Sequence, residues 1–195
     1  MKSLWIVLGV VALLIVVLLF VGGSYIGAKN QMVAKDQNVQ AAFSEIDVNL
    51  QRRSDLIPNL VATVKGYANV EESILVAIAN ARAGLMTAKS PDEKLAANDR
   101  LNVALLPLMQ KQEAYPQLKS NDQFMRLNDE LSGTENRIAV ARRRYNESIR
   151  DYNTFIQQFP NSIWANFAGF HPKTGYYAAD PAAKSAPDVS KELNK

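Results

Sequence analysis

The sequence predicts an all-α protein in which a single N-terminal transmembrane helix is followed by an antiparallel bundle of long helices. Three observations support this fold class. Residues 4–21 contain no charged or polar side chain. Between Gln31 and Phe159, apolar residues recur every three or four positions, and no run alternates as a strand would. We therefore divide the chain into an anchor (1–28), a helical bundle with an aromatic C-terminal segment (29–177) and a disordered tail (178–195).

The N-terminal apolar segment is long enough to cross a bilayer. Extended to residue 26, a helix here covers a hydrocarbon core of about 30 Å. Trp5 and Tyr25 lie near its two ends, where interfacial aromatic residues are expected. The alternative is a cleaved signal peptide, but the run exceeds a usual apolar region and residues 22–27 offer no clean A-x-A site. We therefore predict an uncleaved single-pass anchor over residues 4–26.

The helix that starts in this anchor is expected to continue into the bundle. No Pro or Gly lies between Ala28 and Arg53, so the helix runs for about 75 Å. Pro58 lacks an N–H and crowds the carbonyl four residues back, so we expect a bend or a restart capped by Ser54 or Asp55. The apolar stripe of this first helix consists of Val39, Ala42, Phe43, Ile46 and Leu50.

Two further helices are expected in the middle of the chain. The apolar stripe resumes over residues 57–85, includes Arg82, and ends before the Pro-containing stretch 88–91. A third helix covers residues 94–113 with Asp92 as its N-cap, and Pro107 predicts a kink or break within it.

The last helix carries the clearest periodic signal. Apolar positions alternate three and four apart over residues 124–159, as in the seam of a coiled coil or bundle. Pro160 ends this helix. An aromatic segment follows, and we expect it to fold back on the bundle, with contact to lipid as the alternative. Its apolar members are Ile163, Trp164, Phe167, Phe170, Tyr176 and Tyr177.

Composition excludes several classes of site. The chain has no Cys and a single His, His171, so disulfides, thiolate metal sites and cysteine nucleophiles are absent. The net charge of +3 is too small and too dispersed to indicate nucleic-acid binding. We predict no cofactor, no metal ion and no small-molecule substrate, and an enzyme is the least expected class.

Two separated motifs carry a family resemblance: IDVNLQRRSDLIPNLV (46–61) with TVKGYA (63–68), and LNDEL (127–131), GTENRI (133–138), ARRRYN (141–146), YN (152–153) and FP (159–160). They resemble motifs of the LemA family. The resemblance covers about residues 1–177 and leaves the tail outside. It implies a bacterial single-pass membrane protein with an antiparallel α-helical bundle. It implies no reaction, because the family has no established catalytic residues.

Polar residues around Pro58 form the candidate site. The apolar stripe places Arg53 on the packed side of its helix, where a guanidinium needs a partner. We predict that Arg53 and Asp55, with the neighbouring Asn59, form a structural polar cluster with the last helix. In the alternative, a kink exposes all of these residues to water. The candidate partners that flank the seam of the last helix are Glu135, Tyr145, Glu147 and Asn153.

Three consecutive arginines, Arg142, Arg143 and Arg144, suggest a patch for phosphate or lipid headgroups. Successive helical residues point about 100° apart, so these side chains fan out. We therefore prefer a solvated helix face.

The preferred function is non-enzymatic: a membrane-anchored scaffold, adaptor or self-assembling envelope protein that binds a protein partner or a second copy of itself. The alternatives are a lipid-binding or membrane-remodelling oligomer and, by analogy with LemA-like proteins, an accessory factor of a membrane protease. Lys2 and the α-amino group nearly balance Lys29 and Lys35 across the span. The short basic N-terminus favours the bacterial cytoplasmic (inner) membrane with the bundle on the outer, periplasmic side.

Overall fold

The described part of the chain consists of helices joined by turns and irregular segments. The computed structural model describes residues 2–67, 71–111, 118 and 120–175, and within these ranges no strand occurs. The all-α prediction is therefore confirmed. The helices are α1 (Lys2–Tyr67), α2 (Glu72–Thr87), α3 (Pro91–Lys111), α5 (Asp122–Gln157) and α6 (Asn161–Ala168).

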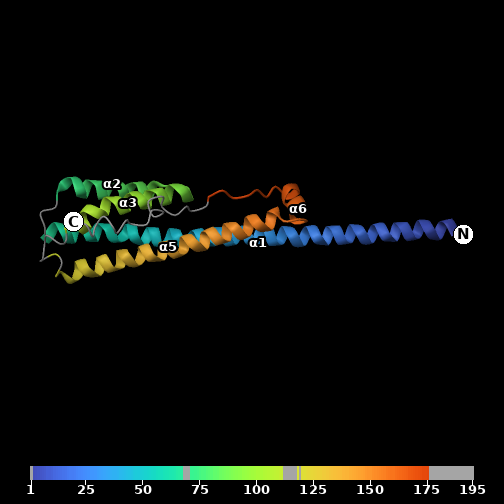
Figure 1. Cartoon of the computed structure of the whole chain (residues 1–195), viewed down its shortest axis with the longest axis horizontal. Helices are drawn as coiled ribbons and strands as arrows, with labels where there is room; N and C mark the ends of the chain where they lie inside the picture. Colours follow the sequence, from blue (N-terminus) through green and yellow to red (C-terminus); the bar gives the residue numbers. More distant parts are fainter. Residues whose placement is uncertain (1, 68–70, 112–117, 119, 176–195) are drawn as a thin grey trace, which may run out of the picture.

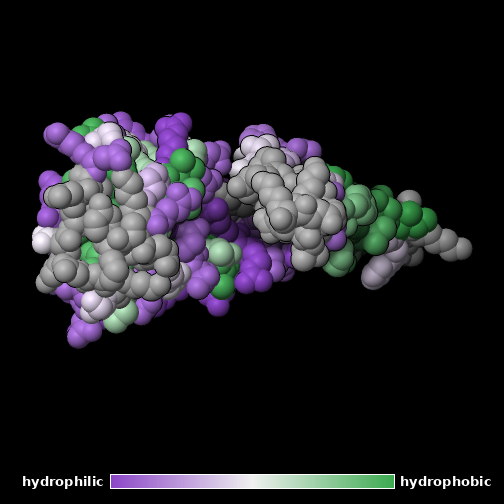
Figure 2. All heavy atoms as spheres, turned by 60° about the vertical axis from the view of Figure 1, so that its left-hand side comes forward, coloured by the Kyte–Doolittle hydropathy of each residue, from purple (hydrophilic) through white to green (hydrophobic). Residues whose placement is uncertain are grey.

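The N-terminal part of α1 has the surface of a membrane span. Residues 4–21 are all exposed, and α1 is the one helix in the described ranges that is long and apolar enough to cross a membrane. Figure 1 shows this part projecting alone from one end of the bundle. Figure 2 shows hydrophobic surface there and mostly hydrophilic surface over the bundle. The prediction of a single apolar N-terminal helix is confirmed.

Of the bend or restart expected at Pro58, the restart is wrong. α1 remains helical through Pro58 and ends at Tyr67, so it has 66 residues and a length of about 100 Å. The next helix accordingly begins at Glu72, not at residue 57. No break marks residue 28, because α1 continues through that position as well.

The bundle is built on α1 and α5. α5 runs antiparallel to the C-terminal part of α1, and these two helices share the most extensive contacts in the described chain (Figure 1). α2 and α3 form a hairpin that covers the end of the bundle far from the N-terminus. The predicted seam of α5 largely matches its buried side chains, which are Phe124, Leu131, Thr134, Ile138, Ala141, Tyr145, Ile149, Tyr152, Asn153 and Ile156.

Local signals explain where α3 and α5 begin. Ser90 Oγ accepts a hydrogen bond from the Glu93 N–H (3.2 Å), and the Glu93 carboxylate accepts from the Lys89 and Ser90 N–H groups. This is a capping box; it makes Ser90 the cap of α3, where the sequence suggested Asp92. Asn121 caps α5 by accepting from the Phe124 N–H at 2.9 Å.

Pro107 lies inside α3 without breaking it. A proline leaves the carbonyl four residues earlier without its helical donor. That carbonyl belongs to Val103, which is 66 % exposed, so water can replace the missing N–H. Of the kink or break expected at Pro107, the break is therefore wrong.

The chain folds back after α5. α6 contacts both α5 and α1, and Trp164 is half-buried. Further on, the Asn153 side chain donates to the Lys173 carbonyl (2.7 Å) and accepts from the Lys173 N–H (2.8 Å). The aromatic segment therefore packs on the bundle at least up to this point. The predictions for Tyr176, Tyr177 and the tail 178–195 fall outside the described residues.

Candidate functional site

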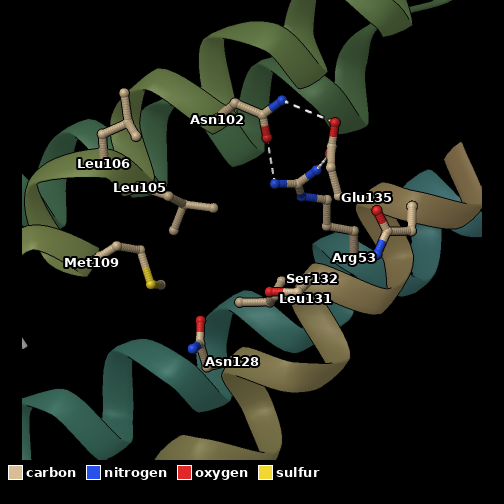
Figure 3. Close-up of a pocket in the computed structure, with 10 residues that line it drawn as sticks. Arg53, Asn102, Leu105, Leu106, Met109, Asn128, Leu131, Ser132 and Glu135 are labelled. Carbon is tan, nitrogen blue, oxygen red and sulfur yellow. Dashed lines mark hydrogen bonds and ion pairs between the residues drawn. The ribbon is translucent and has the colours of Figure 1, made fainter. Parts of the chain in front are cut away.

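Arg53 lies inside the bundle and joins three helices. Its position on α1, three residues after the buried Leu50, turns its guanidinium toward α3 and α5. Arg53 forms an ion pair with Glu135 of α5 and donates to the amide oxygens of Asn98 (3.2 Å) and Asn102 of α3. Asn102 Nδ2 in turn donates to Glu135 at 3.5 Å (Figure 3). We call Arg53, Asn98, Asn102 and Glu135 the Arg53 cluster.

The Arg53 cluster holds a charge in a largely buried place. The Arg53 side chain is 6 % exposed and that of Glu135 is 38 % exposed. Burial, and next the nearby positive charge of Arg142, lower the pKa of Arg53 to about 10, whereas Asp99 acts in the opposite direction. Arg53 is therefore still protonated at neutral pH. Its charge depends on the oxygens around it, since a buried charge without partners is costly.

A second buried contact sits at the adjacent residue, Ser54. Pro58 has no N–H, so it cannot donate to the Ser54 carbonyl as an ordinary helical residue would. Arg82 of α2 supplies the missing donor: its Nε lies 2.9 Å from the Ser54 carbonyl oxygen. Ser54 is 1 % exposed, which leaves little room for water to do the same. This contact explains why α1 passes through Pro58 without a restart.

Residues 53 and 54 therefore bond α1 to α2, α3 and α5. Arg53 bonds to α3 and α5, and the Ser54 carbonyl bonds to α2. Both contacts bury polar groups that must be matched by donors or acceptors on a specific neighbour. The arrangement fixes how the four helices are rotated and shifted against one another.

Two of the predicted cluster residues lie outside it. Asp55 is exposed and accepts from Gln51 Nε2 at 3.0 Å, and Asn59 is exposed, with its carbonyl accepting from Thr63. A step of two residues rotates a helical side chain by about 200°, so Asp55 points away from Arg53. The expectation that Asp55 and Asn59 join this cluster is wrong.

The remaining predicted partners lie elsewhere along α5. Glu147 is exposed and lies about 18 Å along the helix from Glu135. Tyr145 packs against Phe43, with ring centroids 5.8 Å apart, and Asn153 bonds to Lys173. Of the seven residues predicted as members or partners of the cluster, the structure brings together Arg53 and Glu135. The sequence analysis did not predict the contacts of three residues, Asn98, Asn102 and Arg82. The position of Arg82 within an apolar stripe indicated that its charged side chain needs a partner inside the bundle.

A cavity of about 380 Å³ adjoins the Arg53 cluster between α3 and α5 (Figure 3). Three of its six polar lining residues, Arg53, Asn102 and Glu135, already bond to one another. In the described ranges, no group of three metal-ligating side chains is close enough to hold a metal ion. The bonds among Arg53, Asn102 and Glu135 hold α1, α3 and α5 together. The other lining residues are Leu105, Leu106, Met109, Asn128, Leu131, Ser132 and Asn136.

The three consecutive arginines of α5 point in different directions. Arg142 pairs with Asp99 of α3 at 3.0 Å, whereas Arg144 pairs with Glu45 of α1 at 2.7 Å. Two of the three therefore link α5 to different neighbours. This arrangement disfavours a converging phosphate-binding patch.

These features define a class of protein: a helical bundle, held by buried polar contacts, on a helix able to anchor it in a membrane. The family model of the LemA family matches residues 42–190, and the chain belongs to the LemA family. The match begins within α1 and extends to residue 190, so the expectation that the tail beyond 177 lies outside the family pattern is wrong for most of its length.

Two similar proteins are a magnetosome protein and a protein named LemA. The chain is 28 % identical over 190 residues to Magnetosome protein MamQ 2 of Paramagnetospirillum magneticum, covering 84 % of this chain and 69 % of that protein. It is 28 % identical over 146 residues to Protein LemA of Metamycoplasma hominis, covering 73 % of this chain and 64 % of that protein. Neither name describes an enzyme. Together with the apolar N-terminal helix, these relatives support a membrane-associated helical protein.

Proposed function

We propose that this protein is a membrane-anchored, non-enzymatic scaffold that holds its bundle at a fixed height and angle above the bilayer. The observation that carries the proposal is the continuity of α1. Its first part is exposed and apolar, and its remaining length supplies core side chains of the bundle. Those core residues are Ala28, Met32, Val39, Ile46, Leu50, Ile57, Leu60 and Val64.

The junction between span and bundle leaves no room for a flexible linker. The apolar span extends to Ile26, and Ala28 and Met32 are already buried at 7 % and 0 % exposure. The bundle therefore begins within one helical turn of the membrane. A scaffold benefits from such a junction, because a partner bound at the far end of the bundle is held at a defined distance from the lipid.

The membrane and the partner form part of the proposal. The short basic N-terminus supports an inner-membrane anchor with the bundle on the periplasmic side. Similarity to magnetosome proteins supports a role in a cellular assembly rather than in metabolism. The partner is another protein or a second copy of this chain, and the size of the full chain in mild detergent distinguishes an assembling scaffold from a monomeric adaptor.

The height of the bundle provides the test. Because the chain has no Cys, one cysteine at the exposed Glu72 places a single dye at the far end. Energy transfer to acceptors at the surface of vesicles should report a height of about 60 Å, reduced by any tilt. A six-residue Gly/Ser insertion after Gly27 should broaden the distribution and lower its mean, because it uncouples the bundle from the span.

The matched control is the same insertion after Lys89, between α2 and α3, which should leave the height unchanged. Equal distributions for the intact chain and the Gly27 insertion would contradict a rigid junction.

A further inference from the structure

α6 crosses α1 where the membrane span ends. The ring of Tyr25 contacts those of Trp164 and Phe167 edge-on, with centroids 5.6 and 5.7 Å apart. Tyr25 lies one turn after Val21, the last residue of the uninterrupted apolar run. Figure 1 shows α6 beside α1 at the end of the bundle from which the N-terminal part projects.

α6 exposes large apolar side chains on one side. Ala165 is buried, whereas Ile163 and Phe167, four residues apart on one face, are 54 % and 78 % exposed. Phe159, just before the helix, is 81 % exposed. Beyond residue 26, Phe159 and Phe167 are the two most exposed large hydrophobic side chains of the described chain. A cluster of this kind marks a surface that is covered by something apolar.

The position of α6 along α1 indicates that the bilayer covers its exposed apolar side chains. A helix that enters the hydrocarbon at Leu4 leaves it after about 20 residues, which places Tyr25 and α6 at the membrane–water interface. Tyr and Trp prefer this level, and Lys side chains prefer the headgroups just beyond it. Lys29 occupies that place: it is exposed, and its Nζ lies 5.9 Å from the centroid of the Tyr25 ring.

We infer that α6 docks into the interface of the lipid bilayer, with Phe159, Ile163 and Phe167 inserted at the headgroup–acyl boundary. The inference rests on the membrane anchor of the proposed function, but it does not need the scaffold role. The continuous α1 sets the height and angle of the bundle, but a span alone leaves the whole molecule free to rotate about the helix axis. A second contact beside the span fixes which side of the bundle faces the lipid.

Site-directed spin labelling of the full chain in phosphatidylcholine vesicles tests this contact. Single cysteines at Ile163 and Phe167 replace exposed side chains with a label of similar bulk. The Phe167 variant loses one ring contact with Tyr25 but keeps that of Trp164, and circular dichroism verifies the fold of both variants. Collisions with oxygen report on lipid, and collisions with a water-soluble nickel chelate report on solvent. For a face buried about 5–10 Å into the interface, the oxygen-to-nickel ratio should be at least about threefold higher than at a solvent-exposed site.

Two reference positions make the result decisive. A label at Met125, which is 46 % exposed in the first turn of α5, gives the solvent value. α5 begins at the end of the bundle far from the span (Figure 1). A label at Leu13, within the span, gives the lipid value. Ratios at 163 and 167 equal to that at 125, with lipid exposure at 13, would overturn α6 docking and leave the anchor intact. Solvent exposure at 13 would overturn the anchor itself. Shielding of 163 and 167 from both reagents would indicate a protein contact and also overturn the inference.

Discussion

Replacement of Glu135 by Ala should lower the free energy of unfolding of the bundle by about 3 kcal/mol. The substitution leaves the Arg53 guanidinium charged and 6 % exposed, with only the amide oxygens of Asn98 and Asn102 as partners. Removing one partner of a buried pair costs about 3–5 kcal/mol. The lower value is expected because the adjoining cavity can admit water to Arg53. Denaturant unfolding of the full chain in detergent, followed by circular dichroism, measures the effect.

Arg53→Ala should lower the free energy of unfolding by more than about 2 kcal/mol, because it removes two amide contacts and the packing of a long side chain. Replacing both Arg53 and Glu135 by apolar residues should cost less than the sum of the two single changes, since no buried charge then remains.

A neighbouring ion pair provides the control. Arg52 pairs with Glu130 between the same two helices, but these side chains are 57 % and 35 % exposed. Glu130→Ala should therefore lower the free energy of unfolding by less than about 1 kcal/mol. Equal losses for the Glu130 and Glu135 variants would show that burial of Arg53 has no energetic consequence.

Arg82→Met should lower the free energy of unfolding by about 1–3 kcal/mol, the cost of leaving a buried acceptor unpaired. The substitution keeps the apolar stem but removes the donor to the Ser54 carbonyl. The effect should depend on Pro58. Pro58→Ala restores an N–H at the position from which a helix normally donates to residue 54, so it should stabilise the protein by about 1–3 kcal/mol.

In the Pro58→Ala background, Arg82→Met should cost at least about 1 kcal/mol less than in the natural sequence. Pro107→Ala serves as the matched control, because the carbonyl that Pro107 leaves unpaired belongs to the exposed Val103. No coupling between Arg82 and Pro107 is expected. An equal cost of Arg82→Met in all three backgrounds would disprove the role assigned to the Arg82–Ser54 contact.

The seam of α5 could be predicted because its signal is local and repeated. A three-and-four spacing sustained over the helix allows one apolar face, and the buried residues from Phe124 to Ile156 occupy it. Similar reasoning placed Arg53 on the inner face of α1, and Glu135 beside the seam. Neither inference required knowledge of which helices become neighbours.

The path of the chain around Pro58 could not be predicted in this way. The local rule is that a proline deprives a carbonyl of its donor, and that rule holds here. Its consequence depends on Arg82, which lies 28 positions from Ser54 in sequence. The prediction that Asp55 joins the Arg53 cluster was wrong for the opposite reason. Asp55 is near Arg53 in sequence but lies on another side of the helix. Asn98 and Asn102 were missed because a single sequence does not say which face of α3 meets α1.

In the membrane-bound protein, we expect one unbroken helix to lead from the membrane through Pro58 to the far end of the bundle. Spin labels at Phe20 and Lys65, both exposed, bracket the junction and the proline in a chain without native cysteine. Pulsed electron paramagnetic resonance in lipid should give one narrow distance near about 68 Å, the length of 45 helical steps. A broad distribution, or a mean distance below about 55 Å, would show a bend or a restart and contradict a continuous α1.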